Sequence, residues 1–257
     1  MWTQRVPVLV YHHVYKDNAR ELANVGDARG VVALTDFQRQ LDLIDDQGWQ
    51  VVSTSALVDW VIDGAALPER AVVLHFDNGW LDTWSVAMPT LRERGLAGLC
   101  YVITDALAKA SVGEAATVRT LTEGVVSKPF MTWDQANELL EAGWEIGAHT
   151  HTHCKVADKY TDDGDAGVIG EMETSDRIIE AETGSKPIHF AYPSGSRLPA
   201  TDDLLAPRYR SLRLWHAEDP PCWTFTDRDT SRLAIDCQNI DSRVSFADFE
   251  RIFEEAR

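Results

Sequence analysis

The chain has 257 residues, of which 44% are hydrophobic and 25% are charged, proportions typical of a folded protein with a large core. Its 41 acidic residues outnumber its 24 basic ones, so the formal net charge is −17. This balance excludes a basic surface able to neutralise phosphates, and it argues against nucleic acid and anionic lipid as partners. No apolar run approaches the roughly 18 residues of a membrane span. A neutral or cationic substrate fits this composition best.

The start of the chain and its cysteines bear on the compartment. The first residues enter an apolar segment without the basic stretch, long apolar run and cleavage site of a signal peptide. The four cysteines are scattered without a Cys-x-x-Cys pair: Cys100, Cys154, Cys222 and Cys237. We therefore expect a reduced cytoplasmic protein, unless a leader has been removed.

Short apolar runs alternate with amphipathic stretches in the first third of the chain. The pattern predicts strands at 6–11, 49–53 and 71–76, and helices at 35–48 and 57–62. The run at 71–76 is largely apolar, which is typical of a parallel strand covered on both faces.

The alternation continues through the remaining chain. Further strands are predicted at 98–103, 144–148 and 187–192, and further helices at 84–94, 132–142 and 171–182. The small, polar segment 106–127 and the aspartate-rich segment 158–167 are predicted to be long loops. Repeated strand–helix units imply parallel strands with right-handed crossovers. We therefore predict one α/β domain over residues 1–257, a distorted (β/α) barrel.

Polar residues follow three of the predicted strands. Asp77 and Asn78 end the first apolar run, His149 and His153 follow the second, and Tyr192 follows the third. In a parallel barrel these strand ends share the face where active sites are built. Asp-Asn-Gly is also good turn chemistry, but two imidazoles with one oxygen donor are a common catalytic zinc arrangement. His151, between the two histidines, is expected to point elsewhere.

Five segments, in this order and spacing, resemble the polysaccharide deacetylases of the NodB-homology type, carbohydrate esterase family 4. They are Val-Leu-Val-Tyr-His-His-Val at 8–14, Phe-Asp-Asn-Gly at 76–79, Met-Thr-Trp at 131–133, the histidine-rich segment 145–153 and Phe-Ala-Tyr-Pro-Ser-Gly at 190–195. The match runs along most of the chain.

The resemblance implies a role for each matching residue. Asp77 would be the general base, and Asn78, His149 and His153 would hold a divalent metal, usually zinc. The backbone N–H of Ser194 would stabilise the oxyanion. The family has a carboxylate where this chain has Asn78, and an amide oxygen is the weaker zinc ligand. Asn78-Gly79 is prone to deamidation, which would restore that carboxylate.

Other residues are candidates with a competing structural interpretation. Tyr192 and Trp80 are predicted to contact substrate, and Trp84 and Trp215 are further aromatic candidates. Tryptophans in such a fold also pack between helices and sheet.

Two further residues are candidates for proton transfer and for orienting the base. Leu214-Trp215-His216 has the spelling of the family's late Leu-x-His motif, which supplies a general acid. Arg232 either holds a carboxylate or lies on the surface at a strand start.

Three functions follow, in decreasing order of preference. The first is a metal-dependent amide hydrolase that removes N-acetyl groups from amino sugars in an oligo- or polysaccharide. The second is a cytosolic hydrolase of another C–N bond, such as a formamide, ureide or cyclic imide. The third is a carbohydrate-binding protein with a degenerate site. The sequence does not predict an oligomeric state.

Overall fold

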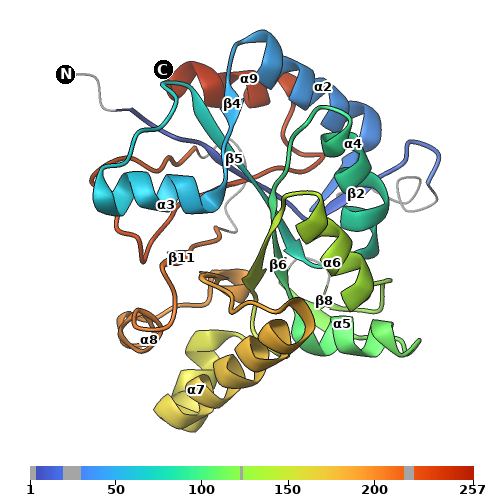
Figure 1. The fold of residues 1–257 in the computed structure, drawn as a ribbon, viewed down its shortest axis with the longest axis vertical. Coiled ribbons are helices and arrows are strands. Elements are labelled where there is room, and N and C mark those ends of the chain that lie inside the picture. The colour runs from blue at the N-terminus through green and yellow to red at the C-terminus, as the bar shows by residue number, and fades with distance from the viewer. Residues whose placement is uncertain (1–3, 20–29, 122–123, 217–222) are drawn as a thin grey trace.

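The computed structural model describes residues 4–19, 30–121, 124–216 and 223–257. Its centre is a curled sheet in which all strand pairs are parallel, with the order β11-β10-β9-β6-β5-β1-β12 and β4 beside β5 (Figure 1). The strands are β1 (Val8–Tyr11), β4 (Gln50–Val51), β5 (Ala71–Asn78), β6 (Leu99–Val102), β9 (Glu145–Ala148), β10 (His189–Ala191), β11 (Ser211–Arg213) and β12 (Gln238–Asn239). A bridge between Arg213 and Ile235 links the two edges. The predicted distorted (β/α) barrel is confirmed.

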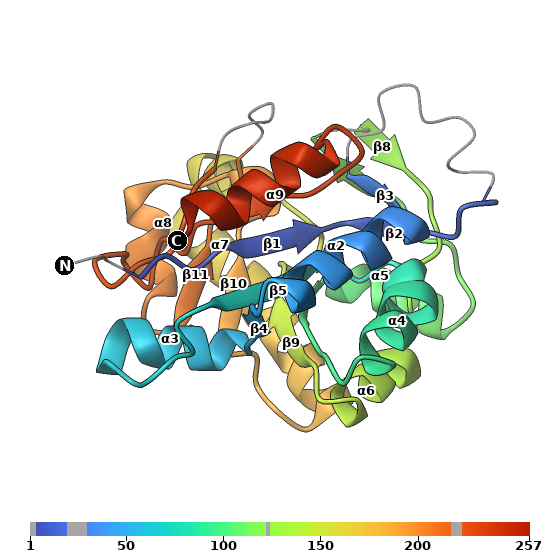
Figure 2. The ribbon, with the colours of Figure 1, turned by 90° about the horizontal axis from the view of Figure 1, so that it is seen from above.

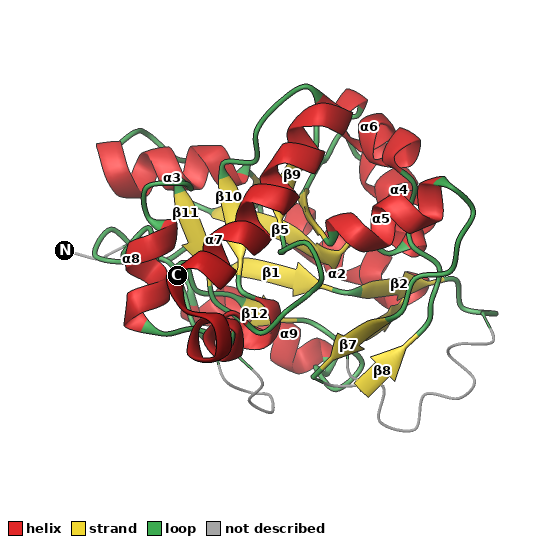
Figure 3. Cartoon of the chain, turned by 90° about the horizontal axis from the view of Figure 1, so that it is seen from below, coloured by secondary structure: helices red, strands yellow, loops and turns green. Residues whose placement is uncertain are grey.

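Helices surround the sheet (Figures 2 and 3). They are α2 (Leu34–Asp46), α3 (Thr54–Asp63), α4 (Met88–Arg92), α5 (Thr104–Ser111), α6 (Trp133–Glu141), α7 (Val156–Thr183), α8 (Pro199–Leu205) and α9 (Phe246–Glu255). A π-helical turn, Thr83–Ala87, precedes α4 and forms the first half of the predicted helix 84–94. Two small sheets pair β2 (His13–Tyr15) with β3 (Val31–Ala33) and β7 (Val118–Thr120) with β8 (Gly124–Val126). None of the helices described is long and apolar enough to cross a membrane.

Strand β5 shows why an apolar sequence can also present catalytic groups. Alternate residues face opposite sides of a strand. Val72, Leu74 and Phe76 belong to the large core beneath the helices. The intervening side chains, including His75 and Asp77, face the inside of the curled sheet, where Asp77 contacts a residue of β11. The alternation therefore places Asp77 inside the barrel.

Both predicted loops are wrong. Segment 106–127 contains most of α5 and the β7–β8 hairpin, because Ala106 and Leu107 are fully buried despite the polar composition around them. Segment 158–167 lies within α7, where the i,i+4 pair Lys159–Asp163 supports a helical turn. The cysteines described are free, as expected, and Cys222 lies outside the described residues.

Candidate active site

The carboxyl ends of β5, β9 and β10 concentrate backbone strain. Four non-glycine residues in the described part of the chain have positive φ, and all lie here: Asn78 (78°), Thr150 (63°), His153 (59°) and Ser194 (56°). This conformation costs roughly 1–3 kcal/mol per residue and persists only where the surroundings impose it. Such clusters mark functional sites, and this one surrounds a pocket.

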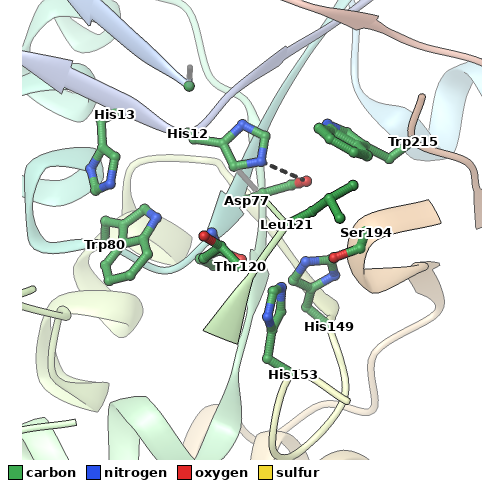
Figure 4. Close-up of a pocket in the computed structure, with 12 residues that line it drawn as sticks. His12, His13, Asp77, Trp80, Thr120, Leu121, His149, His153, Ser194 and Trp215 are labelled. Atoms are coloured by element: carbon green, nitrogen blue, oxygen red, sulfur yellow. Dashed lines mark ion pairs between the residues drawn. The ribbon is translucent and has the colours of Figure 1, made fainter. Parts of the chain in front are cut away.

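The pocket is a cavity of about 30 Å³ at this end of the barrel (Figure 4). Its walls come from the ends of β1, β5 and β9, from the β7–β8 hairpin and from the loops after β10 and β11. They are formed by His12, His13, Gly30, Asp77, Asn78, Trp80, Thr120, Leu121, His149, His153, Ser194 and Trp215. A cavity of this size holds one or two water-sized groups. A whole sugar ring does not fit within it.

His149 and His153 lie side by side, with ring centroids 5.0 Å apart. The Nδ1 of His149 lies 2.8 Å from the carbonyl oxygen of Ala191, and that of His153 lies 2.8 Å from the carbonyl oxygen of Arg119. Because a carbonyl only accepts, each Nδ1 carries the proton and each Nε2 keeps its lone pair. Burial lowers the pKa of His149 to about 3 and also lowers that of His153. Both rings are therefore neutral and have the tautomer that metal ligands need.

Asn78 lines the same pocket as His149 and His153. Its side chain is 2% exposed, and its Oδ1 is buried without a hydrogen-bond partner in the described structure. An unsatisfied buried acceptor costs about 1–3 kcal/mol unless something outside the protein binds it. An amide oxygen and two imidazole nitrogens are donors that fit a divalent cation. No cluster of three His, Cys, Asp or Glu suited to a metal occurs among the residues described, and Asn78 is not one of these residue types.

Asp77 lies beside Asn78 in very different surroundings. Both of its oxygens accept from Nη2 of Arg213 at 2.6 Å, and Nε2 of His12 lies 3.8 Å from its Oδ2. Burial by itself would raise the pKa of Asp77, but Arg213, with His149 and His12, lowers it to about 2. Asp77 is therefore a carboxylate at any working pH.

Arg213 is the residue that sequence reasoning missed. It ends β11 and is fully buried, with its guanidinium 5.0 Å from the ring centroid of Tyr101. The available signal was an arginine between Leu212 and Leu214, because a charge in an apolar strand needs a buried partner. Arg232, the arginine considered instead, donates to backbone carbonyls of the segment 206–210, away from Asp77.

The histidine candidate for proton transfer differs from the one that the sequence suggested. His216 pairs with Asp236 at 2.6 Å, its side chain is 40% exposed, and it does not line the pocket. His12 does line it, and burial lowers the pKa of His12 to about 4 although Asp77 acts in the opposite direction. His151 bonds to Thr104 outside the pocket lining, as expected for a bystander.

Of the aromatic candidates, some line the pocket and others do not. Trp80 lines the pocket, stacks on Phe130 and His13, and has a buried indole N–H without a partner in the described structure. Trp215 lines the opposite side (Figure 4) and donates to Oδ1 of Asn239 at 3.3 Å. Tyr192 is outside the lining, because its hydroxyl donates to Asp202 at 2.7 Å in the core.

Ser194 lies in the short 3₁₀ turn Pro193–Gly195 and borders the pocket near His149 (Figure 4). Its left-handed backbone continues into Gly195, where a Cβ would lie 2.1 Å from the carbonyl oxygen of Trp215. Glycine at 195 thus allows the turn to pack directly against the Trp215 segment. Trp84 bonds to Glu138 and does not line the pocket.

Comparison with known proteins agrees with this arrangement. The profile of the family described as "Polysaccharide deacetylase" matches residues 64–208. The protein YxkH of Bacillus subtilis (strain 168), named provisionally as a polysaccharide deacetylase, is 21% identical over 152 residues. That match covers 59% of this chain and 44% of YxkH, so the chain spans less than half the length of this relative.

Solved structures share the fold across the whole chain. The deacetylase PplD of Streptococcus pyogenes in complex with acetate has a TM-score of 0.80 at 19% identity, covering 98% of this chain and 99% of PplD. A de-N-acetylase of Aggregatibacter actinomycetemcomitans has a TM-score of 0.79 at 20% identity, covering 96% and 99%. IcaB of Ammonifex degensii has a TM-score of 0.75 at 20% identity, covering 98% and 97%.

Proposed function

Because the chain belongs to the polysaccharide deacetylase family, we propose that it hydrolyses the acetamide group of an N-acetylated amino sugar with a divalent metal, zinc by preference. One observation carries this proposal. An ionised carboxylate, Asp77, shares a pocket with three donor atoms that lack protein partners in the described structure, those of Asn78, His149 and His153. This is what metal-assisted hydrolysis of an amide requires.

Two sets of pocket residues have different roles, metal binding and proton abstraction. A divalent metal held by Oδ1 of Asn78 and Nε2 of His149 and His153 would supply Lewis acidity toward the acetyl carbonyl and water. Asp77 takes the proton of the attacking water as general base. Arg213 fixes the orientation of Asp77 through both carboxylate oxygens.

Other pocket residues serve the remaining steps. The backbone N–H of Ser194 donates to the oxyanion of the tetrahedral intermediate. We assign to His12 the transfer of the proton that Asp77 takes from water to the leaving amine, because His12 lines the pocket 3.8 Å from Asp77, whereas His216 is bonded to Asp236 outside it. Trp80 and Trp215 border a cavity that is large enough for an acetyl group and too small for a bulky acyl group.

The enclosed pocket also favours a second candidate, hydrolysis of another small C–N compound such as a formamide, ureide or cyclic imide. Only the reacting carbonyl of such a substrate has to enter the cavity of about 30 Å³, as for an acetyl group. A degenerate binding protein fits less well, because nothing in it would maintain an ionised base beside unpartnered donors. The cytoplasmic location stays a prediction.

The experiment is acetate release by metal-depleted protein reloaded with zinc, cobalt, manganese or nickel. The substrates are N-acetylglucosamine, its oligomers, and a panel of small formamides and cyclic imides. Acetate release that needs metal and disappears in Asp77→Asn supports deacetylation. Turnover of the small amides alone supports the second candidate, and no acetate from any acetamido sugar with any metal overturns the proposal.

A further inference from the structure

A cavity of about 350 Å³ lies apart from the active-site pocket, and the two have no described lining residue in common. It is formed by the end of β2 and the residues after it, by the π-helical turn before α4, and by residues 128–129 before α6. Its size is within the roughly 300–1,000 Å³ of sites that bind small organic molecules. The residues assigned to hydrolysis all lie outside its described lining, so this cavity is a candidate for a separate binding site.

The lining combines apolar side chains with two ammonium groups. The apolar part consists of Tyr15, Ala19, Leu81, Val86 and Pro129. Lys16 and Lys128 supply the positive charges, and no ion pair among the described residues engages Lys16, which is exposed. Apolar walls with a few placed polar groups are typical of small-molecule sites. A ligand with an apolar body and a negative charge therefore matches both parts of this lining.

One carboxylate, that of Asp82, is among the described lining residues, but its oxygens are directed into the protein. Its Oδ1 lies 2.8 Å from Nδ1 of His13, and its Oδ2 accepts from the backbone N–H of Val14 at 2.9 Å. The residue is only 9% exposed. A ligand therefore meets two cations and a carboxylate whose oxygens are already bonded. On a chain of net charge −17, such a local excess of positive charge favours an anion over a cation.

The cavity is connected to the active-site pocket through His13. This ring lines the active-site pocket and stacks on Trp80, with centroids 4.8 Å apart (Figure 4), and on Tyr15, with centroids 5.0 Å apart. Because a carboxylate only accepts, the Nδ1 of His13 beside Asp82 carries a proton, and its Nε2 can accept from Nζ of Lys128 at 3.3 Å. Lys128 thus lines this cavity and also contacts a wall of the active-site pocket.

We propose that this cavity binds a small organic anion, a monocarboxylate with an aryl or alkyl body. The carboxylate accepts hydrogen bonds from the ammonium groups of Lys16 and Lys128, and such charge-assisted bonds are about twice as strong as neutral ones. The apolar body packs against Leu81 and Val86. The ligand and His13 then share the donors of Lys128, so occupancy changes the surroundings of the His13 ring. This site does not depend on the proposed function, because the base and the metal ligands lie outside its described lining.

The test is calorimetric titration of the full chain, with and without added zinc, with 4-phenylbutyrate, its uncharged amide 4-phenylbutyramide, and inorganic phosphate. We expect 4-phenylbutyrate to bind about tenfold more tightly than either of the other probes, with the same affinity in both metal states. The double variant Lys16→Met/Lys128→Met should weaken its binding by about tenfold or more. Ser85→Phe, at an exposed residue of the lining, should fill the cavity and abolish binding while both lysines remain. Lys186→Met, at an exposed lysine outside the lining, is the matched control and should bind normally.

Nuclear magnetic resonance locates the ligand independently of affinity. The Hε1 signal of the His13 ring, identified by its loss in His13→Gln, should move when 4-phenylbutyrate is added to the wild type and stay in place in Ser85→Phe. Equal affinity for the three probes overturns the proposal, as does an affinity unchanged in the double lysine variant or in Ser85→Phe. Binding that requires zinc places the ligand in the active-site pocket and overturns it as well. Absence of acetate release from every sugar leaves it intact, because none of these measurements uses turnover.

Discussion

Asp77 and Asn78 are adjacent in the chain and similar in size, but the fold treats them in opposite ways. Both oxygens of Asp77 are bonded to a buried arginine. Oδ1 of Asn78 is equally buried and has no hydrogen-bond partner in the described structure. The protein therefore compensates the charge of Asp77 with its own arginine. Oδ1 of Asn78, by contrast, remains available to a bound group.

The neighbours of the two residues follow the same division. On the Asn78 side, His149 and His153 are neutral and fixed by backbone carbonyls. On the Asp77 side, the carboxylate is held in place by the charged guanidinium of Arg213, which belongs to β11. The base should therefore be preorganised in the free protein, whereas the ligand half becomes satisfied only when a cation binds.

The strongest test of this difference removes the negative charge of the base, Asp77. Asp77→Asn should lower acetate release about 10²–10⁴-fold, because proton abstraction is lost. It should also cost about 3–5 kcal/mol in the free energy of unfolding, since Arg213 stays buried without its partner. Steady-state kinetics and urea unfolding measure the two effects.

The double variant Asp77→Asn/Arg213→Met is the control for that test. It removes both buried charges, so the free energy of unfolding should recover while activity stays low. Recovery of activity would show that Asp77 is not the base. A stability unchanged in the single variant would contradict a tightly compensated pair.

The next largest effect concerns the ligand side. Asn78→Asp should tighten zinc binding by about tenfold or more, because a carboxylate is the better ligand, and Asn78→Ala should weaken it. Competition with a chromophoric chelator measures both, after peptide mass analysis has shown that residue 78 is still an amide. Equal affinity in all three proteins would show that residue 78 does not touch the metal.

A smaller effect is expected from His189, at the other end of the barrel interior. Burial lowers the pKa of His189, with Arg210 acting in the same direction and Glu145 and Asp59 against it. The unfolded chain therefore takes up a proton as the pH falls below about 6.5 while the folded chain does not. Stability should be full above that pH and decline below it.

The measurement is the free energy of unfolding in urea at pH 7.5, 6.5 and 5.5. His189→Gln keeps a polar side chain beside Ser211 without a titrating group, so its stability should fall less over this range. An identical pH dependence in the two proteins would exclude His189 as a contributor.

The smallest expected effect is on substrate binding through Trp215. Asn239 accepts from the indole N–H of Trp215 and donates to the buried Asp241, which also holds the backbone of Gly30 in the pocket wall. Asn239→Ala should raise KM a few-fold, as loss of one hydrogen bond of about 1 kcal/mol implies, and leave kcat nearly unchanged. Asn239→Gln keeps both the acceptor for Trp215 and the donor for Asp241 and is the control. A fall in kcat alone would contradict a positioning role.

Local sequence determined much of this protein. The alternation of apolar runs and amphipathic stretches fixed the parallel strands, and the polar residues at their ends put Asp77, Asn78, His149 and His153 on one face. These features depend on residues close together in the chain, where periodicity reports directly on structure. The same logic failed at 158–167, because acidic and glycine-rich composition resembles a loop even where an exposed helical turn forms.

Only the tertiary structure decided which distant residues complete the site. Arg213 reaches Asp77 across 136 positions, His12 follows the end of β1, and Tyr192 turns into the core although it follows a strand end. The cavity of about 680 Å³ beside the pocket likewise joins residues of the β7–β8 hairpin to residues 158–163 of α7, and both segments were expected to be loops. Such pairings depend on how the sheet curls and in which register its strands meet. Neither property is encoded within any single segment of the sequence.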